Sequence, residues 1–233
     1  MSTKRNMKQE VIGLFWVVFL ALLFRSVAYE MYYIPSSSMY PNLLIGDRIL
    51  INKYAYGISK YSFPMSPPLF EGRKFVMNLP RRGDVIVFET DKIYIKRLIG
   101  LPGDSIQIID GQIFINGSEV PKKKSGKFTS FDQESNKYTH TLPNKRQYIV
   151  LDDRLTELDN TEVYRVPENH YFFMGDNMDN SNDSRNLHGI GYVKFDNLIG
   201  KAENIIFSSR YPMYDVINFF QYFRSGRTFK SIK

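Results

Sequence analysis

The sequence contains no cysteine and only three histidines among its 233 residues. The absence of cysteine excludes disulfides, thiolate metal sites and a catalytic thiol. None of the histidines, His140, His170 and His188, lies in a pattern typical of a metal site or a catalytic base. A hydrolytic site in this chain is therefore expected to use other side chains, and lysine is the alternative general base for a serine nucleophile.

Nucleic-acid recognition motifs are also absent, although the net charge is +7. The basic residues are scattered along the chain or gathered near its ends instead of forming one stripe. An anionic membrane surface is therefore a better partner for this charge than nucleic acid, and no nucleic-acid partner is expected.

Long apolar runs are rare too, and the only one is Val11–Phe24. A membrane-spanning helix needs about 20 apolar residues. The run reaches that length at Tyr29 if the side chain of Arg25 extends to the interface, where Tyr29, Tyr32 and Tyr33 would form an aromatic belt. The sequence therefore predicts a transmembrane signal-anchor and its interface at 11–33.

The flanking charges predict an orientation for this anchor. Residues 1–10 carry Lys4, Arg5 and Lys8 against one acid, so they are expected to stay in the cytoplasm, with everything after Tyr33 outside. A cleavable signal peptide is the alternative interpretation, because small residues occur at Ser26 and Ala28. Arg25 before that site and the bulky Tyr29 after it favour an uncleaved anchor.

From Gly46 onward the pattern is that of β structure. Gly-Asp turns precede short β-branched runs at 48–52, 85–88 and 105–109, and Asp110-Gly111 joins the last of these to 112–115 as a tight hairpin. The expected fold is mostly β, an antiparallel sheet domain built from 34–120 and 162–209. Residues 121–161 are predicted to be an irregular β insertion with a short strand at 148–151. Residues 210–233 form a basic aromatic tail, either a packed terminal helix or a segment lying on the membrane.

A run of serines between two prolines follows the apolar segment. In Ile34–Pro41 each proline fixes its own φ and pushes the preceding residue toward an extended conformation. The serines therefore lie in a short, stiff loop next to the expected membrane surface. Ser38 is the candidate nucleophile, and an ordinary solvated loop is the competing interpretation.

Lys96 is the candidate base for that serine. In the predicted strand 93–99, a period of two places Tyr94, Lys96 and Leu98 on one face. An apolar setting of this kind removes water from the ammonium group and lowers its pKa toward the range that a general base needs. The alternative is an exposed lysine on a strand surface.

The third cluster is a run of Asp, Asn and Ser between Phe172 and Arg185, after an apolar strand. It suggests a loop held by bonds from side chains to the backbone. A calcium loop starting at Asp179 fails, because its sixth position is Ser184 instead of Gly and its twelfth is Ile190 instead of Glu.

The three clusters together resemble the bacterial type I signal peptidases, which are membrane-anchored serine–lysine proteases. The matching segments are Ile34–Pro41 with Leu43 and Gly46-Asp47, then Tyr94–Asp104, and then Gly175-Asp176-Asn177, Asp179-Asn180-Ser181 and Asp183-Ser184-Arg185. Met178 departs from the family pattern, which usually has Arg there, at a position without a catalytic role. The resemblance covers the chain from its anchor to about Lys201.

The resemblance implies removal of signal peptides from exported preproteins at the outer, periplasmic face of the bacterial plasma membrane. Ser38 would be the nucleophile and Lys96 the general base, and Ser36 Oγ with the Ser38 N–H would form the oxyanion hole. No metal and no cofactor are implied. Ser181 would orient the lysine. Two ion pairs, Asp183 with Arg185 and Asp176 with Arg97, would hold the site in place. Ile34 and Ile95 would help to line a pocket for small substrate residues.

Two alternatives stay open. A self-cleaving repressor-type protease shares the Ser/Lys chemistry and a β fold, but it carries a DNA-binding or polymerase-associated segment in place of an anchor. A non-catalytic, membrane-anchored β protein that binds partners through its basic tail would tolerate the loss of Ser38 and Lys96.

Overall fold

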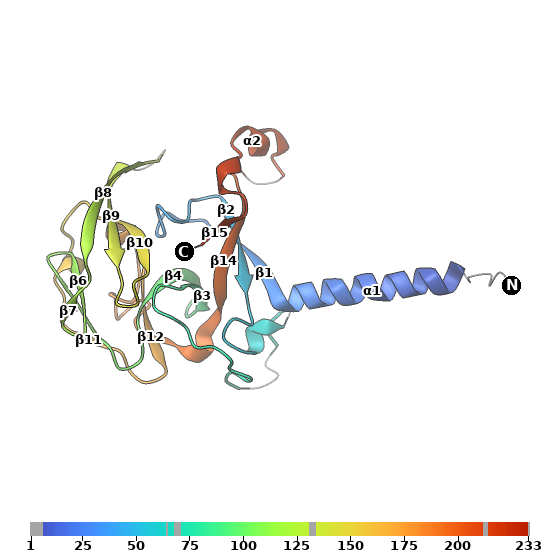
Figure 1. Cartoon of the computed structure of the whole chain (residues 1–233), viewed down its shortest axis with the longest axis horizontal. Coiled ribbons are helices and arrows are strands. Elements are labelled where there is room, and N and C mark those ends of the chain that lie inside the picture. The colour runs from blue at the N-terminus through green and yellow to red at the C-terminus, as the bar shows by residue number, and fades with distance from the viewer. Residues whose placement is uncertain (1–6, 64, 68–70, 131–133, 212–213, 233) are drawn as a thin grey trace.

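The computed structural model describes residues 7–63, 65–67, 71–130, 134–211 and 214–232. One long helix, α1 (Met7–Ala28), projects from a body made mainly of strands, and the short helix α2 (Val216–Gln221) lies at the edge of that body (Figure 1). Five single-turn 3₁₀ helices occur in the connections: η1 (Lys60–Ser62), η2 (Glu157–Asp159), η3 (Met178–Asn180), η4 (Phe195–Asn197) and η5 (Ser225–Arg227).

The main sheet has eight strands in the order β1-β2-β14-β3-β4-β12-β13, with β15 paired to β14. The strands are β1 (Tyr29–Tyr33), β2 (Asp47–Asn52), β3 (Val85–Glu89), β4 (Ile93–Gly100), β12 (His170–Met174), β13 (Val193–Lys194), β14 (Leu198–Ser208) and β15 (Lys230–Ser231). Every pairing among these strands is antiparallel. The antiparallel β class and the strands expected at 48–52, 85–88 and 93–99 are therefore confirmed.

Two smaller sheets flank the main one. The first has the order β11-β5-β6-β7 and the second the order β10-β9-β8. Their strands are β5 (Ser105–Ile109), β6 (Gln112–Ile115), β7 (Ser118–Glu119), β8 (Lys122–Thr129), β9 (Glu134–Thr141), β10 (Gln147–Leu151) and β11 (Tyr164–Arg165). The hairpin expected across Asp110-Gly111 joins β5 to β6, which confirms it.

The strands form where apolar residues alternate along the chain. In β2 the side chains alternate between buried and half-buried, and both Ile49 and Ile51 are fully buried. They join Ile34, Met39 and Leu43 of the serine loop in one apolar cluster. Packing of these aliphatic side chains fixes the loop against the sheet.

The insertion is more regular than expected. Residues 122–129 and 134–141 form two long paired strands, and 147–151 add the third strand of a sheet. The strand β8 shows no alternation, since nearly all of its side chains are exposed. Its conformation is set by hydrogen bonding to β9 and not by a buried face, and for this reason the lysine-rich sequence carried no strand signal.

The structure supports the N-terminal expectation only in part. Tyr29, Tyr32 and Tyr33, expected as an aromatic belt next to a spanning helix, lie in β1, which pairs with β2 along its whole length. Within the described part of the chain, no helix is both long and apolar enough to cross a membrane. The side chain of Arg25 and residues 1–6, with Lys4 and Arg5, lie outside the described residues.

Candidate functional site

The serine loop is closed at its base by backbone hydrogen bonds. Ile34 N donates to Asp47 O at 2.9 Å, and Gly46 N donates to Ile34 O at 3.0 Å. Inside this closure, Tyr40 N donates to Ser37 O at 2.9 Å. The loop therefore holds Ser38 by its own turn and by its attachment to the start of β2.

Ser38 and Lys96 meet in the folded chain, although 58 positions separate them. Lys96 Nζ lies 2.6 Å from Ser38 Oγ, and both side chains are buried, 3% and 8% exposed. Lys96 stands in β4 opposite Ile86 of β3. Ser38 is therefore not part of an ordinary solvated loop, and Lys96 is not an exposed lysine on a strand surface, which were the two competing interpretations.

Burial lowers the pKa of Lys96 from 10.5 to about 8, because removal from water disfavours the ammonium form. The carboxylates of Asp183 and Asp176 act in the opposite direction, and Arg185 adds to the lowering. At pH 7 roughly a tenth of Lys96 is therefore neutral, and this fraction rises with pH. A neutral amine 2.6 Å from a hydroxyl can accept its proton.

Ser36 lies next to Ser38, on the solvent-exposed side of the serine loop. Its Oγ is 3.3 Å from Ser38 Oγ, and the residue is exposed to solvent. A hydroxyl that is open to solvent and adjacent to the nucleophile can donate to an oxygen that develops negative charge there.

The Asp/Asn/Ser cluster packs behind this pair. Arg185 contacts Asp183 through Nε and Nη2, each at 2.9 Å from a carboxylate oxygen, and Asp183 Oδ2 also accepts from Gly175 N at 3.0 Å. Both charged side chains are buried. Burial raises the pKa of Asp183, but the charge of Arg185 together with the hydrogen bonds from Arg185 and Gly175 outweighs it. The pKa of Asp183 is therefore lowered, and Asp183 stays ionised beside Lys96.

Ser181 departs from its expected role as the residue that orients Lys96. Its Oγ is buried and makes no hydrogen bond of good geometry within the described structure. It lies near enough to Asp183 to help lower the pKa of that carboxyl. Ser181 instead packs against Gly175, where an added Cβ would stand 2.1 Å from Ser181 Oγ and 2.6 Å from Ser38 O. Only glycine fits at position 175.

A second buried ion pair joins β4 to the same cluster. Arg97 Nε and Nη2 each lie 2.7 Å from an oxygen of Asp176, and the two side chains are 1% and 0% exposed. The guanidinium also stacks 4.5 Å from the ring centre of Tyr148 in β10. This pair connects the lysine strand, the loop after β12 and the insertion.

Two asparagines near Ser38 also hold this region together, although the sequence pattern predicted no role for them. Asn42 Nδ2 donates to Asp176 Oδ2 and to Ile149 O, both at 2.7 Å. Asn177 donates from its backbone to Ser38 O and from its side chain to Ser37 O, both at 3.1 Å. The Asn-rich composition was visible in the sequence, but these distant partners were not.

The residues expected to line a substrate pocket share one apolar cluster. Ile34 is buried in it, 2% exposed, and Ile95 packs partly buried against it. The Ile34 side chain is therefore mostly part of the apolar core, and the Ile95 side chain is the more accessible to solvent of the two.

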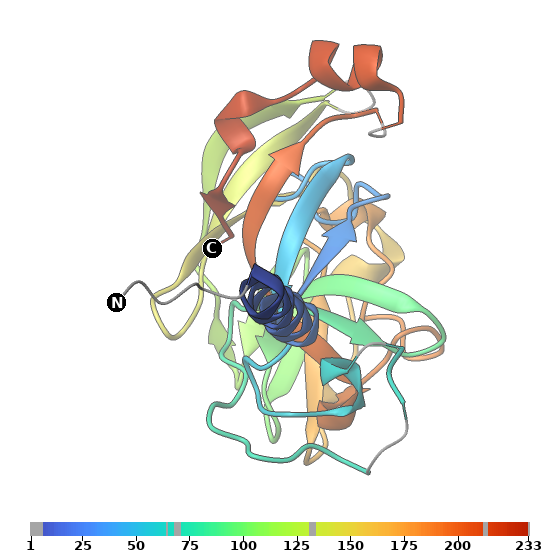
Figure 2. The ribbon, with the colours of Figure 1, turned by 90° about the vertical axis from the view of Figure 1, so that its right-hand side faces the viewer.

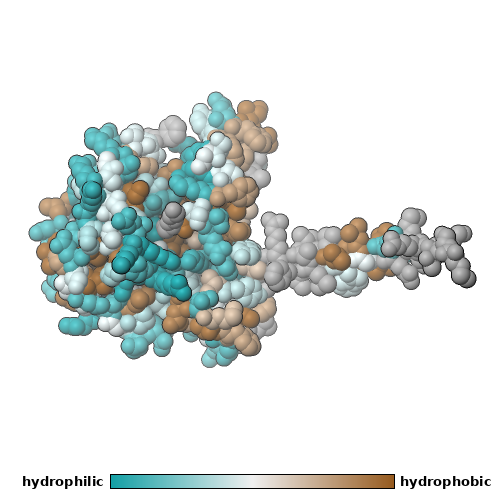
Figure 3. All heavy atoms as spheres, in the orientation of Figure 1, coloured by the Kyte–Doolittle hydropathy of each residue, from teal (hydrophilic) through white to brown (hydrophobic). Residues whose placement is uncertain are grey.

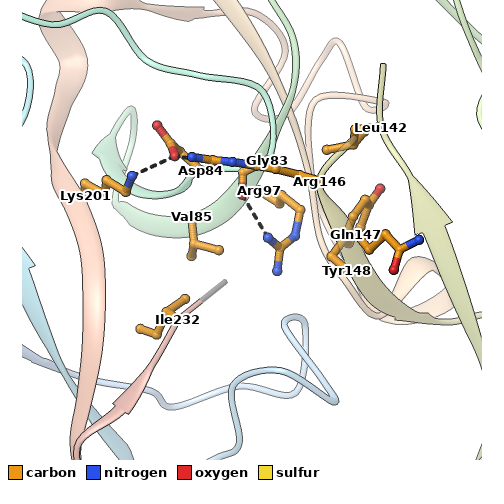
Figure 4. Close-up of a pocket in the computed structure, with 10 residues that line it drawn as sticks. All are labelled: Gly83, Asp84, Val85, Arg97, Leu142, Arg146, Gln147, Tyr148, Lys201 and Ile232. Carbon is orange, nitrogen blue, oxygen red and sulfur yellow. Dashed lines mark hydrogen bonds and ion pairs between the residues drawn. The ribbon is translucent and has the colours of Figure 1, made fainter. Parts of the chain in front are cut away.

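A cavity of about 350 Å³ lies on the other face of β4 (Figure 4). Arg97 lines it together with Arg146 and Lys201, which both contact Asp84 Oδ1, at 2.6 and 2.8 Å. Each of these cations is already paired with a carboxylate. The hydroxyl among its lining side chains is that of Tyr148, which lies 3.3 Å from His140 Nδ1. Burial raises the pKa of Tyr148, so this hydroxyl is a poor nucleophile near neutral pH.

Comparison with known proteins identifies the family of this chain. A family model described as "Signal peptidase, peptidase S26" matches residues 7–207. The chain belongs to this family. Proteins named signal peptidase I from Rickettsia typhi and Rickettsia akari are both 41% identical to it over 231 residues, covering 92% of this chain and 85% of theirs.

Among solved structures, the signal peptidase I of Enterococcus faecalis V583 is 27% identical in sequence to this chain. The match covers 53% of this chain and 97% of the Enterococcus chain. Its TM-score of 0.33 is too low to support an argument about the fold. The segments after residue 207, including α2 and β15, lie beyond the family match.

Proposed function

We propose that this family member removes signal peptides from exported preproteins, with Ser38 as nucleophile and Lys96 as general base. The observation that carries this assignment is the 2.6 Å contact between a buried serine and a buried lysine whose pKa is lowered to about 8. The assignment needs no other base, and none of the three histidines of the chain enters the mechanism.

The reaction follows from the geometry. Ser38 Oγ attacks the scissile carbonyl carbon while Lys96 Nζ accepts the hydroxyl proton. Lys96 then donates that proton to the leaving nitrogen, the C–N bond breaks, and an ester links the signal peptide to Ser38. A water molecule gives its proton to Lys96 and attacks the ester, which releases the peptide acid and returns the proton to Ser38 Oγ. Ser36 Oγ and the Ser38 N–H stabilise the oxyanion in both halves.

The free edges of the main sheet support binding of an extended substrate. The strand β12 pairs with β4 only from Arg97 onward, so Ile93–Lys96 is paired on one side alone within the described structure. The strand β1 is the opposite edge of the sheet. Tyr29 and Met31 of β1 and Ile93 of β4 line one cavity of about 520 Å³. A peptide strand added between these edges would be led to Ser38.

Selectivity for small residues before the cut belongs to the same proposal. An enclosed apolar pocket formed near Ile34 and Ile95 excludes large side chains by overpacking. The tight packing of Ile34 leaves little space around it.

We further propose that α1 attaches the enzyme to the plasma membrane, with the N-terminus cytoplasmic and the β body on the outer side. The described side chains from Val11 to Val17 include six large apolar residues that are more than half exposed. The helix carries them away from the body (Figures 1 and 3). Transfer of such side chains from water into lipid is favourable. Membrane lipids are therefore proposed as the second partner, after signal peptides.

The test is cleavage of a preprotein by the detergent-solubilised enzyme. Ser38→Ala and Lys96→Ala are expected to lose activity by at least about 1,000-fold, since the two groups act as one unit. Far-UV circular dichroism is used to check that both variants remain folded, because a smaller side chain leaves a cavity at each of these buried sites. Processing by both variants at the rate of the wild type would favour the non-catalytic binding protein instead.

A further inference from the structure

The tail after β14 returns to the nucleophile loop. It passes through α2 and η5 and ends in β15, which pairs with β14 (Figure 2). Two arginines of this tail, Arg224 and Arg227, point into the protein and are 26% and 14% exposed. The tail thus differs from a purely membrane-facing basic segment, one of the two alternatives that its composition left open.

Both arginines bind the segment that follows the catalytic serine. Arg227 forms a two-point contact with the fully buried carboxylate of Asp47, with Nη2 2.5 Å from Oδ2 and Nε 3.1 Å from Oδ1. Its Nη2 also donates to Asn42 O at 2.8 Å. Arg224 Nη1 donates to Ile45 O at 3.0 Å and to Ser208 Oγ at 2.9 Å. Guanidinium groups suit such two-point contacts better than ammonium groups.

These contacts fall on the closure of the serine loop. Asp47 O accepts from Ile34 N, and Asp47 Oδ2 accepts from Leu44 N at 2.7 Å. Asn42, only four positions after Ser38, is held from the other side by its amide bonds to Asp176 and Ile149. The position of Ser38 relative to Lys96 therefore depends on a segment that the tail holds at Asn42, Ile45 and Asp47.

We propose that Arg227, assisted by Arg224, is a positioning residue that sets the register of the nucleophile loop. The tail acts as an internal clamp that holds Ser38 Oγ within reach of Lys96 Nζ. Neither arginine touches the reacting atoms, and both lie outside residues 7–207, the part of the chain that the family match covers. This inference rests on the proposed roles of Ser38 and Lys96.

The kinetic test compares Arg227→Gln with Lys230→Gln in the full-length enzyme. The two variants remove the same charge from the same tail, but Lys230 is exposed. The substrate is a synthetic peptide with alanine at the first and third positions before the cut. A displacement of the nucleophile by about 1 Å lowers kcat by about 100-fold, so Arg227→Gln should lose about that much kcat with KM changed less than about threefold. Lys230→Gln should match the wild type, and Arg227→Lys should fall between, because it keeps the charge but not the two-point contact.

A second measurement separates positioning from general stability and does not need activity. Amide hydrogen exchange in residues 36–46 should speed up in Arg227→Gln, while exchange in β4 and β12 stays as in the wild type. An unchanged kcat in the folded variant, or faster exchange throughout the sheet, would overturn the clamp. If wild type and Ser38→Ala were equally inactive while exchange still changed only in this loop, the proposed function would fail and the clamp would stand.

Discussion

At the scale of single residues, the proposed chemistry depends on Lys96 being uncharged at the pH of the reaction. The side chain is 3% exposed, and burial outweighs the attraction of Asp183 and Asp176. The same burial that prepares the base makes the folded state less stable whenever Lys96 is protonated. Function and stability are therefore opposed at this position.

The pH dependence follows from the lowered pKa of Lys96. We expect kcat/KM to rise with pH through an apparent pKa of about 8 and to level off above it, since only neutral Lys96 accepts the proton. Peptide cleavage measured between pH 6 and 10 checks this, with Lys96→Arg as the variant that should be inactive throughout. A profile without a group titrating near 8 would exclude Lys96 as the base.

The same shift has a consequence for stability. Between the folded pKa of about 8 and the ordinary value of 10.5, the unfolded chain holds the proton and the folded chain does not. The contribution of Lys96 to the free energy of unfolding therefore rises with pH across this window and is unfavourable below it.

At the scale of elements, the site is assembled by contacts between segments far apart in the chain. The loop after β12 meets the end of β10, where Leu151 N donates to Asp176 O at 2.8 Å. Asp176 in turn binds Arg97 of β4. A buried ion pair with good geometry serves here as the connection between the catalytic strand and the insertion.

Removal of one partner of that pair should be costly. Asp176→Asn removes the carboxylate that pairs with the buried Arg97 guanidinium, so the free energy of unfolding should fall by about 3–5 kcal/mol. Urea unfolding followed by far-UV circular dichroism and tyrosine fluorescence measures this. The matched control is Glu134→Gln at the exposed Lys127–Glu134 pair, where the change should stay below about 1 kcal/mol. Equal effects of the two substitutions would contradict the role given to the buried pair.

At the scale of the whole molecule, the proposed attachment through α1 would separate location from the chemistry of the β body. The helix extends away from the sheets, while the serine loop follows β1 directly (Figure 1). An enzyme held to a membrane through α1 keeps Ser38 close to the surface from which a signal peptide emerges.

Membrane attachment through α1 is testable by surface substitution. The triple variant Val11→Ser, Leu14→Ser and Phe15→Ser removes apolar side chains that are 61–64% exposed. It should move the protein from the membrane fraction to the soluble fraction after carbonate extraction, because less apolar surface is available to lipid. Leu155→Ser, at a 77% exposed apolar residue of the insertion, is the control that should leave fractionation unchanged. Equal membrane retention of the triple variant would contradict attachment through α1.

Much of this protein was predictable from the sequence, because local periodicity determines local structure. Alternation predicted the strand that carries Lys96, and Gly-Asp turns predicted the strands around it. The prolines around Ser38 predicted a stiff loop. Where alternation was missing, as in lysine-rich β8, the strand could not be predicted, because its partner β9 and not its own side chains determines it.

Only the tertiary structure decided which distant groups meet. It brought Ser38 within 2.6 Å of Lys96, left Ser181 without the expected bond to that lysine, and turned Arg227 toward Asp47, 180 positions away. The degree to which Lys96 loses water, and hence its pKa, also depends on how the elements pack. A sequence shows which side chains can do chemistry, but distances and burial arise from packing between segments that no local pattern relates.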